Sequence, residues 1–77
     1  MWENSEGEQM VHLKVKEVAE RKGVSMGKLS RKSDVAYNTI KRIYDDPNYS
    51  PTVNTLAKLA KALDVPIAEL IEILPDD

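Results

Sequence analysis

The feature that most constrains the fold is the helical apolar pattern of VNTLAKLAKAL, residues 53–63. Its apolar residues recur at spacings of three and four, which places them on one broad stripe of an α-helix. The residues of this stripe are Val53, Leu56, Ala57, Leu59, Ala60 and Leu63. A stripe this wide predicts a central helix on which the other elements pack. Thr52 can cap its start, and Asp64 suits a turn at its end.

The size of the chain limits what can pack on that helix. It has 77 residues and no cysteine, which predicts one domain with a small core and without disulfides or thiolate metal sites. No apolar run approaches the roughly 20 residues of a membrane span, and the N-terminus lacks the basic and apolar regions of a secretion signal. We therefore expect a cytoplasmic protein that does not contact a membrane.

Two short helices are predicted on either side of a tight turn at Asp34. The first covers residues 26–33 and has Ser25 as its N-cap, and the second covers about residues 36–44. Aspartate is one of the few residues other than glycine that tolerate a left-handed turn. Two short helices joined in this way cross steeply and expose the start of the second, which is the geometry of a helix-turn-helix unit.

Two further helices complete an all-α prediction. VKEVAERK, residues 15–22, has helical spacing and ends at Gly23, and IAELIEIL, residues 67–74, lies between two prolines. The segment 11–14 alternates apolar and basic or polar residues, so it is either a short strand or arm, or the first turn of a helix. The sequence thus predicts a compact domain of five helices in which this segment has no obvious internal strand to pair with.

Charge is unevenly distributed along the chain. The net charge is -2, but residues 14–61 hold all eleven basic residues against five acidic ones, a local net charge of +6. This separation suggests a basic face, although lysine on helix surfaces is common. We expect a flexible acidic tail at residues 1–10, the domain at 11–74 and a short tail at 75–77.

The predicted helix at 36–44 has an unusual division of residues. Its two isoleucines, Ile40 and Ile43, suit the core. The side chains on its exposed positions are Tyr37, Asn38, Lys41 and Arg42. An ordinary surface helix can have this pattern, and so can a helix whose outward face contacts nucleic acid. The residues alone leave both interpretations open.

Together the segments AERKGVSMGKLSRKSDVAYNTIKRI and SPTVNTLAKLAKALDVPIAELI resemble the Cro and phage-repressor type of helix-turn-helix domain, the XRE family. The resemblance covers roughly Val15 to Ile71 and implies a lambda-repressor-like fold that binds double-stranded DNA. It rests on residues in matching order and spacing: Gly23, Val24, Ser25, Leu29, Val35, Thr39, Ile40, Ile43, Pro51, Thr55, Leu56, Leu59, Ala60, Ala62, Leu63, Val65 and Leu70.

The resemblance also implies site residues. The recognition helix would run from about Ala36 to Tyr44 and present base-reading candidates Ala36, Tyr37, Asn38, Lys41 and Arg42. Asparagine pairs with adenine, arginine or lysine with guanine, and an alanine methyl group contacts the thymine methyl group. Phosphate contacts would come from the start of the second helix and from the loop after the recognition helix, with candidates Ser25, Met26, Lys28 and Tyr49.

The chain departs from the family pattern at several positions. Met26 stands where the family often has glutamine, so it can only pack or make apolar contacts. Ala19 and Tyr44 stand where the family commonly pairs arginine with glutamate, and we expect them to pack together. Asp45 and Asp46 follow the recognition helix, where DNA phosphates would repel them unless they face away.

Catalysis is the least supported class of function. His12 is the only histidine, and nothing places serine, histidine and aspartate side chains together. A metal site would need carboxylate partners for His12, so a solvated or interface histidine is the favoured interpretation. We expect no enzyme activity, no metal and no cofactor.

Two functions remain from the sequence. The first is a transcriptional regulator that binds a near-palindromic operator as a homodimer, because one small module reads few base pairs and the resembling family usually pairs. The second is an antitoxin-like or other protein-interaction module with secondary DNA binding. Candidates for the dimer contact are Val11 and Leu13 in the alternating segment and Ile71 and Leu74 in the predicted fifth helix, which is slightly favoured.

Overall fold

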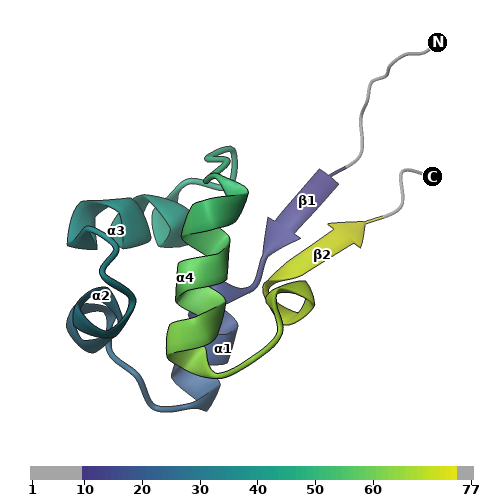
Figure 1. The fold of residues 1–77 in the computed structure, drawn as a ribbon. Coiled ribbons are helices and arrows are strands. Elements are labelled where there is room, and N and C mark those ends of the chain that lie inside the picture. The colour runs from purple at the N-terminus through teal and green to yellow at the C-terminus, as the bar shows by residue number, and fades with distance from the viewer. Residues whose placement is uncertain (1–9, 75–77) are drawn as a thin grey trace, which may run out of the picture.

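The structure is a computed structural model that describes residues 10–74. In chain order its elements are β1 (Met10–Leu13), α1 (Val15–Arg21), α2 (Met26–Ser33), α3 (Tyr37–Asp45), α4 (Val53–Leu63), the 3-10 helix η1 (Ile67–Leu70) and β2 (Ile71–Leu74). Helix α4 stands in the middle, with α2 and α3 on one side and the two-stranded sheet of β1 and β2 on the other (Figure 1).

The helix boundaries follow the sequence signals. The side chains of Ser25 and Thr52 cap α2 and α4, each accepting a hydrogen bond from the backbone N–H three residues further on, at 3.2 and 3.1 Å. Asp34 and Asp64 follow α2 and α4 with φ angles of 61° and 60°, in the left-handed region. The predicted caps and aspartate turns are therefore confirmed.

The core surrounds α4 as predicted, but the apolar stripe of this helix is narrower than expected. Val53 is 74% exposed, and Ala57 is exposed as well. Val53 begins α4, and because side chains lean toward the helix N-terminus, it extends past the packed turns. The buried core consists of Val15, Val18, Ala19, Leu29, Val35, Ile40, Ile43, Leu56, Leu59, Ala60, Leu63 and Leu70.

The prediction of a fifth α-helix at residues 67–74 is wrong. Only η1 is helical there, and the chain then continues as β2, which pairs antiparallel with β1. Two β-branched residues, Ile71 and Ile73, alternate with Glu72, and this pattern suits a strand. Pairing with β1 gives β2 backbone hydrogen-bond partners, and this long-range pairing decides between the two local patterns.

The alternating segment at residues 11–14 therefore has an internal partner, contrary to expectation. In the ribbon formed by β1 and β2, Leu13 lies opposite Ile71 and Val11 lies opposite Ile73. Leu13 and Ile71 pack against the core, while Val11 and Ile73 are 51% and 60% exposed. One end of the apolar face of the ribbon is thus covered and the other is open.

The predicted tails lie almost wholly outside the described residues. The exception is Met10, which begins β1. No helix among residues 10–74 is both long enough and apolar enough to cross a membrane.

Candidate nucleic-acid interface

Side-chain hydrogen bonds fix the turn between α2 and α3. Ser30 Oγ donates to the carbonyl oxygen of Val35 at 2.6 Å. Ser33 Oγ donates to the carbonyl oxygen of Leu29 at 2.6 Å and accepts from the N–H of Val35 at 3.3 Å. Ser33 is the one buried polar residue found within residues 10–74. Because both hydroxyls bind Val35, they set the direction in which the chain leaves the turn toward α3.

The buried hydroxyl of Ser33 was not predicted from the sequence. Serine at the last position of a helix is usually solvated, and its burial depends on how α2 packs on the rest of the domain. The only signal in the sequence was the spacing of Ser33 two residues before an apolar residue, Val35.

Helix α3 is anchored on one face and open on the other. Ile40 is 0% and Ile43 is 6% exposed, so both belong to the core. The five predicted base-reading residues are all exposed: Ala36, Tyr37, Asn38, Lys41 and Arg42. Ala36 is the N-cap residue of α3 and not part of its first turn. The structure therefore brings these candidates together on one outward surface, as the helical period predicted.

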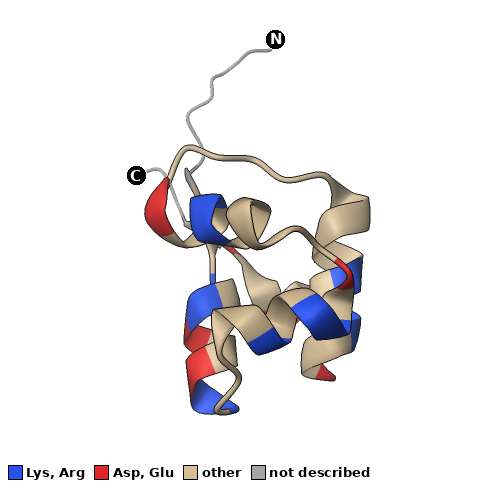
Figure 2. Ribbon diagram, turned by 90° about the vertical axis from the view of Figure 1, so that its left-hand side faces the viewer, with Lys and Arg blue, Asp and Glu red and all other residues tan. Residues whose placement is uncertain are grey.

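The side of the molecule that carries α2 and α3 is basic. Figure 2 views this side and shows basic positions on both α2 and α3, with acidic positions in the turn between them and at the end of α3, and both kinds on α1. The basic residues of α2 are Lys28, Arg31 and Lys32, and all three are exposed. This arrangement accounts for how a chain with a net charge of -2 can present a positive surface to a polyanion.

The start of α2 has the groups needed to hold a phosphate. Ser25 and Lys28 are exposed, and the first N–H groups of a helix have no intrahelical partner. Met26 is half-buried and packs against the core, in agreement with the expectation that it can only make apolar contacts. The sequence-based assignment of phosphate contacts here is compatible with the geometry.

The two acidic residues at the C-terminal end of α3 are engaged within the protein. Asp45 Oδ2 lies 2.9 Å from Lys41 Nζ, and this hydrogen bond, together with the charge of Asp45, raises the pKa of Lys41. Asp46 Oδ1 accepts a hydrogen bond from the N–H of Asn48 at 2.9 Å. Asp45 thus pairs with a side chain of α3, and Asp46 stabilises the loop that follows.

The last candidate, Tyr49, lies in the α3–α4 loop. It is half-buried against the core, and the guanidinium carbon of Arg42 lies 4.4 Å from the centroid of its ring. This distance is typical of a cation–π contact. The sequence placed Tyr49 near DNA phosphates but did not predict its contact with Arg42.

Ala19 and Tyr44 occupy the positions of the family's common ion pair. Ala19 is buried in the core, and Tyr44 packs against that core while remaining partly exposed. Burial raises the pKa of the Tyr44 hydroxyl, and the negative charge of Glu20 raises it further. Both residues thus belong to the same apolar cluster, and their direct contact stays a prediction.

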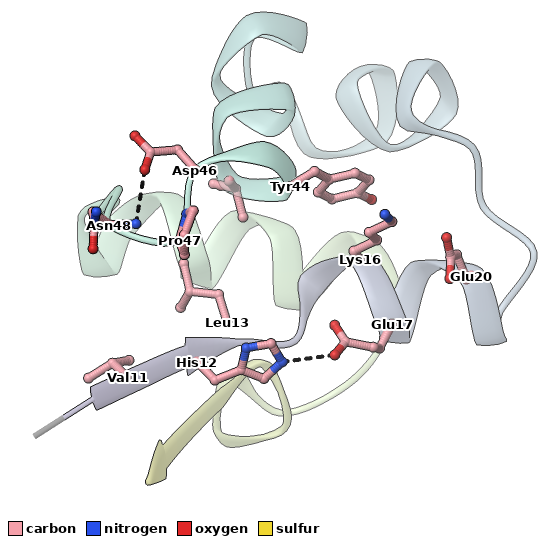
Figure 3. A pocket seen from close by; sticks show the side chains of 11 residues that line it. Val11, His12, Leu13, Lys16, Glu17, Glu20, Tyr44, Asp46, Pro47 and Asn48 are labelled. Atoms are coloured by element: carbon pink, nitrogen blue, oxygen red, sulfur yellow. Dashed lines mark hydrogen bonds and ion pairs between the residues drawn. The ribbon is translucent and has the colours of Figure 1, made fainter. Parts of the chain in front are cut away.

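A groove that the sequence did not predict runs between β1, α1 and the α3–α4 loop. It has a volume of about 730 Å³. At its rim His12 Nε2 lies 2.8 Å from Glu17 Oε2 (Figure 3), and this hydrogen bond lowers the pKa of the Glu17 carboxyl. The lining residues are Val11, His12, Leu13, Lys16, Glu17, Glu20, Ile43, Tyr44, Asp46, Pro47 and Asn48.

The fold and the α2–turn–α3 geometry define a helix-turn-helix protein. Residues 14–76 match the family model of the Cro/C1-type HTH DNA-binding domain. This match spans most of the chain, so the protein belongs to that family, and the resemblance seen in the sequence is confirmed. A search among curated proteins finds no match to the chain.

Proposed function

We propose that the protein is a sequence-specific transcriptional regulator that reads its operator with the outward face of α3. The observation that supports this most is the division of α3 into a buried face, Ile40 and Ile43, and an exposed face that carries four side chains suited to base contacts, those of Tyr37, Asn38, Lys41 and Arg42. Asn38 would pair with adenine, and Arg42 or Lys41 with guanine. Ser25 and Lys28 would hold the phosphate backbone at the start of α2.

We further propose that two copies bind a near-palindromic operator. A single α3 reads too few base pairs for selective binding, whereas a two-fold pair places two such helices about 34 Å apart, one turn of DNA. The four dimer candidates from the sequence all fall on the ribbon, because the predicted fifth helix is replaced by β2. Val11, Leu13 and Ile71 share one face of it, because residues that lie opposite one another or two apart on a strand point to the same side.

Among residues 10–74, the ribbon exposes both apolar side chains and backbone groups that have no hydrogen-bond partner. The N–H of Lys14 donates to the carbonyl oxygen of Leu70 at 2.8 Å, and this pair continues the hydrogen-bond ladder between the strands by one step. In an antiparallel ladder, hydrogen-bonded residue pairs alternate with non-hydrogen-bonded pairs. Lys14 and Leu70 form a bonded pair, so Val11 and Leu13 fall in non-bonded pairs, and their N–H and C=O groups point away from β2. Val11 and Ile73, which lie opposite one another, supply the exposed apolar pair.

Matched lysine substitutions test the dimer. Ile73→Lys adds a charge to the open end of the ribbon, and Val53→Lys adds the same charge at another exposed apolar position, on α4. We expect sedimentation to show a monomer for the first variant and a dimer for the second, both with native helicity. A monomeric unmodified protein would refute the homodimer, and two dimeric variants would exclude the ribbon as the contact.

Selection of bound sequences from a random pool of double-stranded DNA tests the regulator itself. We expect enrichment of near-palindromic sites by the unmodified protein and loss of that enrichment in Asn38→Ala. Absence of enrichment by a folded protein would refute sequence-specific binding.

The groove beside β1 favours a second candidate function, an antitoxin-like or other protein-interaction module. It exposes apolar residues such as Val11 and Pro47 next to the unpaired edge of β1, where a partner chain could add a strand. Such a module would copurify with its partner and bind DNA poorly alone. Strong, salt-dependent DNA binding by the isolated protein favours the regulator instead.

A further inference from the structure

The side chain of Arg42 is not free on the surface of α3. It lies over the ring of Tyr49, with 4.4 Å between the guanidinium carbon and the ring centroid. An exposed arginine normally loses rotamer freedom when it binds a base, and a partner that holds it beforehand lowers that loss. The contact therefore matters for recognition if Tyr49 is itself fixed.

Two features fix Tyr49. Its ring packs against the apolar core, and its N–H donates to the carbonyl oxygen of Asp46 at 3.0 Å. The side chain of Asp46 also accepts from the N–H of Asn48 at 2.9 Å, which closes a tight turn just before Tyr49. The aromatic ring is thus attached to the core and to an ordered turn.

The nearby carboxylates do not draw Arg42 away from the ring. Asp45 and Asp46 are three and four residues after Arg42, the spacings at which helical side chains meet. Asp45 is bound to Lys41 at 2.9 Å, and Asp46 accepts from the loop backbone. Within residues 10–74, Arg42 makes no hydrogen bond to a carboxylate. Its donors remain available to a ligand.

A guanidinium stacked on a ring keeps its N–H donors in its own plane, pointing beyond the ring edge. This fork is the group that binds O6 and N7 of guanine together. Lys41 differs, since it is already paired with Asp45 and carries a point charge without fork geometry. The geometry of Arg42 therefore suits a bidentate contact with a base, whereas that of Lys41 does not.

We propose that Tyr49 is a positioning residue that holds Arg42 as the guanine reader of α3, while Lys41 contributes charge and little base selectivity. This inference rests on the proposed DNA-reading role of α3. Tyr49 acts through Arg42, so its own hydroxyl is not required.

Variants of Tyr49 separate this role from others. Tyr49→Phe keeps the ring, whereas Tyr49→Leu keeps apolar bulk without a π face. For each variant the Kd is measured by fluorescence anisotropy on a DNA site selected by the unmodified protein, and on copies of that site with one base pair changed. Tyr49→Phe should discriminate like the unmodified protein, and Tyr49→Leu should lose about 3- to 10-fold in discrimination at one G·C position.

A double-mutant comparison shows whether Tyr49 acts through Arg42. Arg42→Ala should lose roughly 10- to 100-fold at the same G·C position, and adding Tyr49→Leu to it should cause no further loss. The salt dependence should be the same for Tyr49→Leu and the unmodified protein. NMR of the free protein should show ring-current shifts of the Arg42 side-chain protons that vanish in Tyr49→Leu.

Each contrary result has a distinct meaning. Absence of the ring-current shifts in the free protein, or full discrimination by Tyr49→Leu, would overturn the positioning role while leaving the DNA-binding proposal intact. Equal losses by Tyr49→Phe and Tyr49→Leu would show that the hydroxyl contacts DNA, and a further loss in the double variant would show a general structural role. Failure of the unmodified protein to discriminate between sites would refute both proposals.

Discussion

Removing the hydroxyl of Ser33 tests whether the turn between α2 and α3 depends on a buried hydrogen bond. In Ser33→Ala the N–H of Val35 loses its hydroxyl acceptor, 3.3 Å away, in a region where both residues are buried. An unsatisfied buried donor costs about 1 to 3 kcal/mol. Alanine is a better helix former than serine by about 0.5 kcal/mol. The expected net loss in the free energy of unfolding is therefore about 0.5 to 2.5 kcal/mol.

Urea unfolding followed by circular dichroism at 222 nm measures this loss, and thermal unfolding gives a second measure, because 1 kcal/mol lowers the Tm of so small a domain by about 4 to 8 °C. Ser50→Ala is the matched control, since Ser50 is exposed in the α3–α4 loop. A Ser33→Ala protein as stable as the control would refute the reasoning. It would mean that the N–H of Val35 finds water or another acceptor when the hydroxyl is absent.

Other predictions concern the core, the recognition face, salt and pH. Leu59→Ala should cost about 2 to 5 kcal/mol in urea unfolding, since Leu59 is fully buried, whereas Val53→Ala should change little. Arg42→Ala should weaken specific DNA binding by about 1 to 3 kcal/mol and lower the Tm by only a few degrees, through the loss of the contact with Tyr49. A large fall in Tm with unchanged affinity would mark Arg42 as a structural residue instead. If each protomer makes about five phosphate contacts, the slope of log affinity against log salt should be near -4 to -5 per protomer, and a flat plot would contradict a phosphate-binding surface. The hydrogen bond from His12 lowers the pKa of Glu17 in the folded protein below its ordinary value of 4.5. The pair therefore stabilises the fold fully above pH 4.5, and this stabilisation is lost as the pH falls through the lower folded pKa. Urea midpoints between pH 7 and about pH 3 should therefore fall less in Glu17→Gln than in the unmodified protein, and equal slopes would contradict the pair.

The sequence predicted the parts of the fold that local chemistry decides. The caps at Ser25 and Thr52 and the left-handed turns at Asp34 and Asp64 depend on a few neighbouring residues, and all four are confirmed. The predicted helix at residues 67–74 is wrong because its eight residues fit both a helical and an alternating pattern. The choice depends on β1, about sixty positions earlier in the chain, and local reasoning cannot weigh such a partner.

The candidate site likewise has features that local sequence predicts and features that depend on more distant contacts. The exposed face of α3 follows from helical period once Ile40 and Ile43 are placed in the core. The contact of Arg42 with Tyr49 does not, because it depends on the path of the loop between α3 and α4. A loop of this kind is shaped by side chains such as Asp46 that bind the backbone, and the sequence shows the aspartate without showing which group it binds.

The pairing of β1 with β2 also determines where the chain can be extended. Met10 lies opposite Leu74, so both ends of the described chain leave the domain at the same end of the ribbon. That ribbon lies across α4 from α2 and α3 (Figure 1). A fluorescent reporter or a second domain fused to either end would start on the side away from the helix-turn-helix surface. A short linker between the two ends would likewise allow circular permutation, with new ends after α1, without cutting the α2–turn–α3 unit or the loop that holds Tyr49.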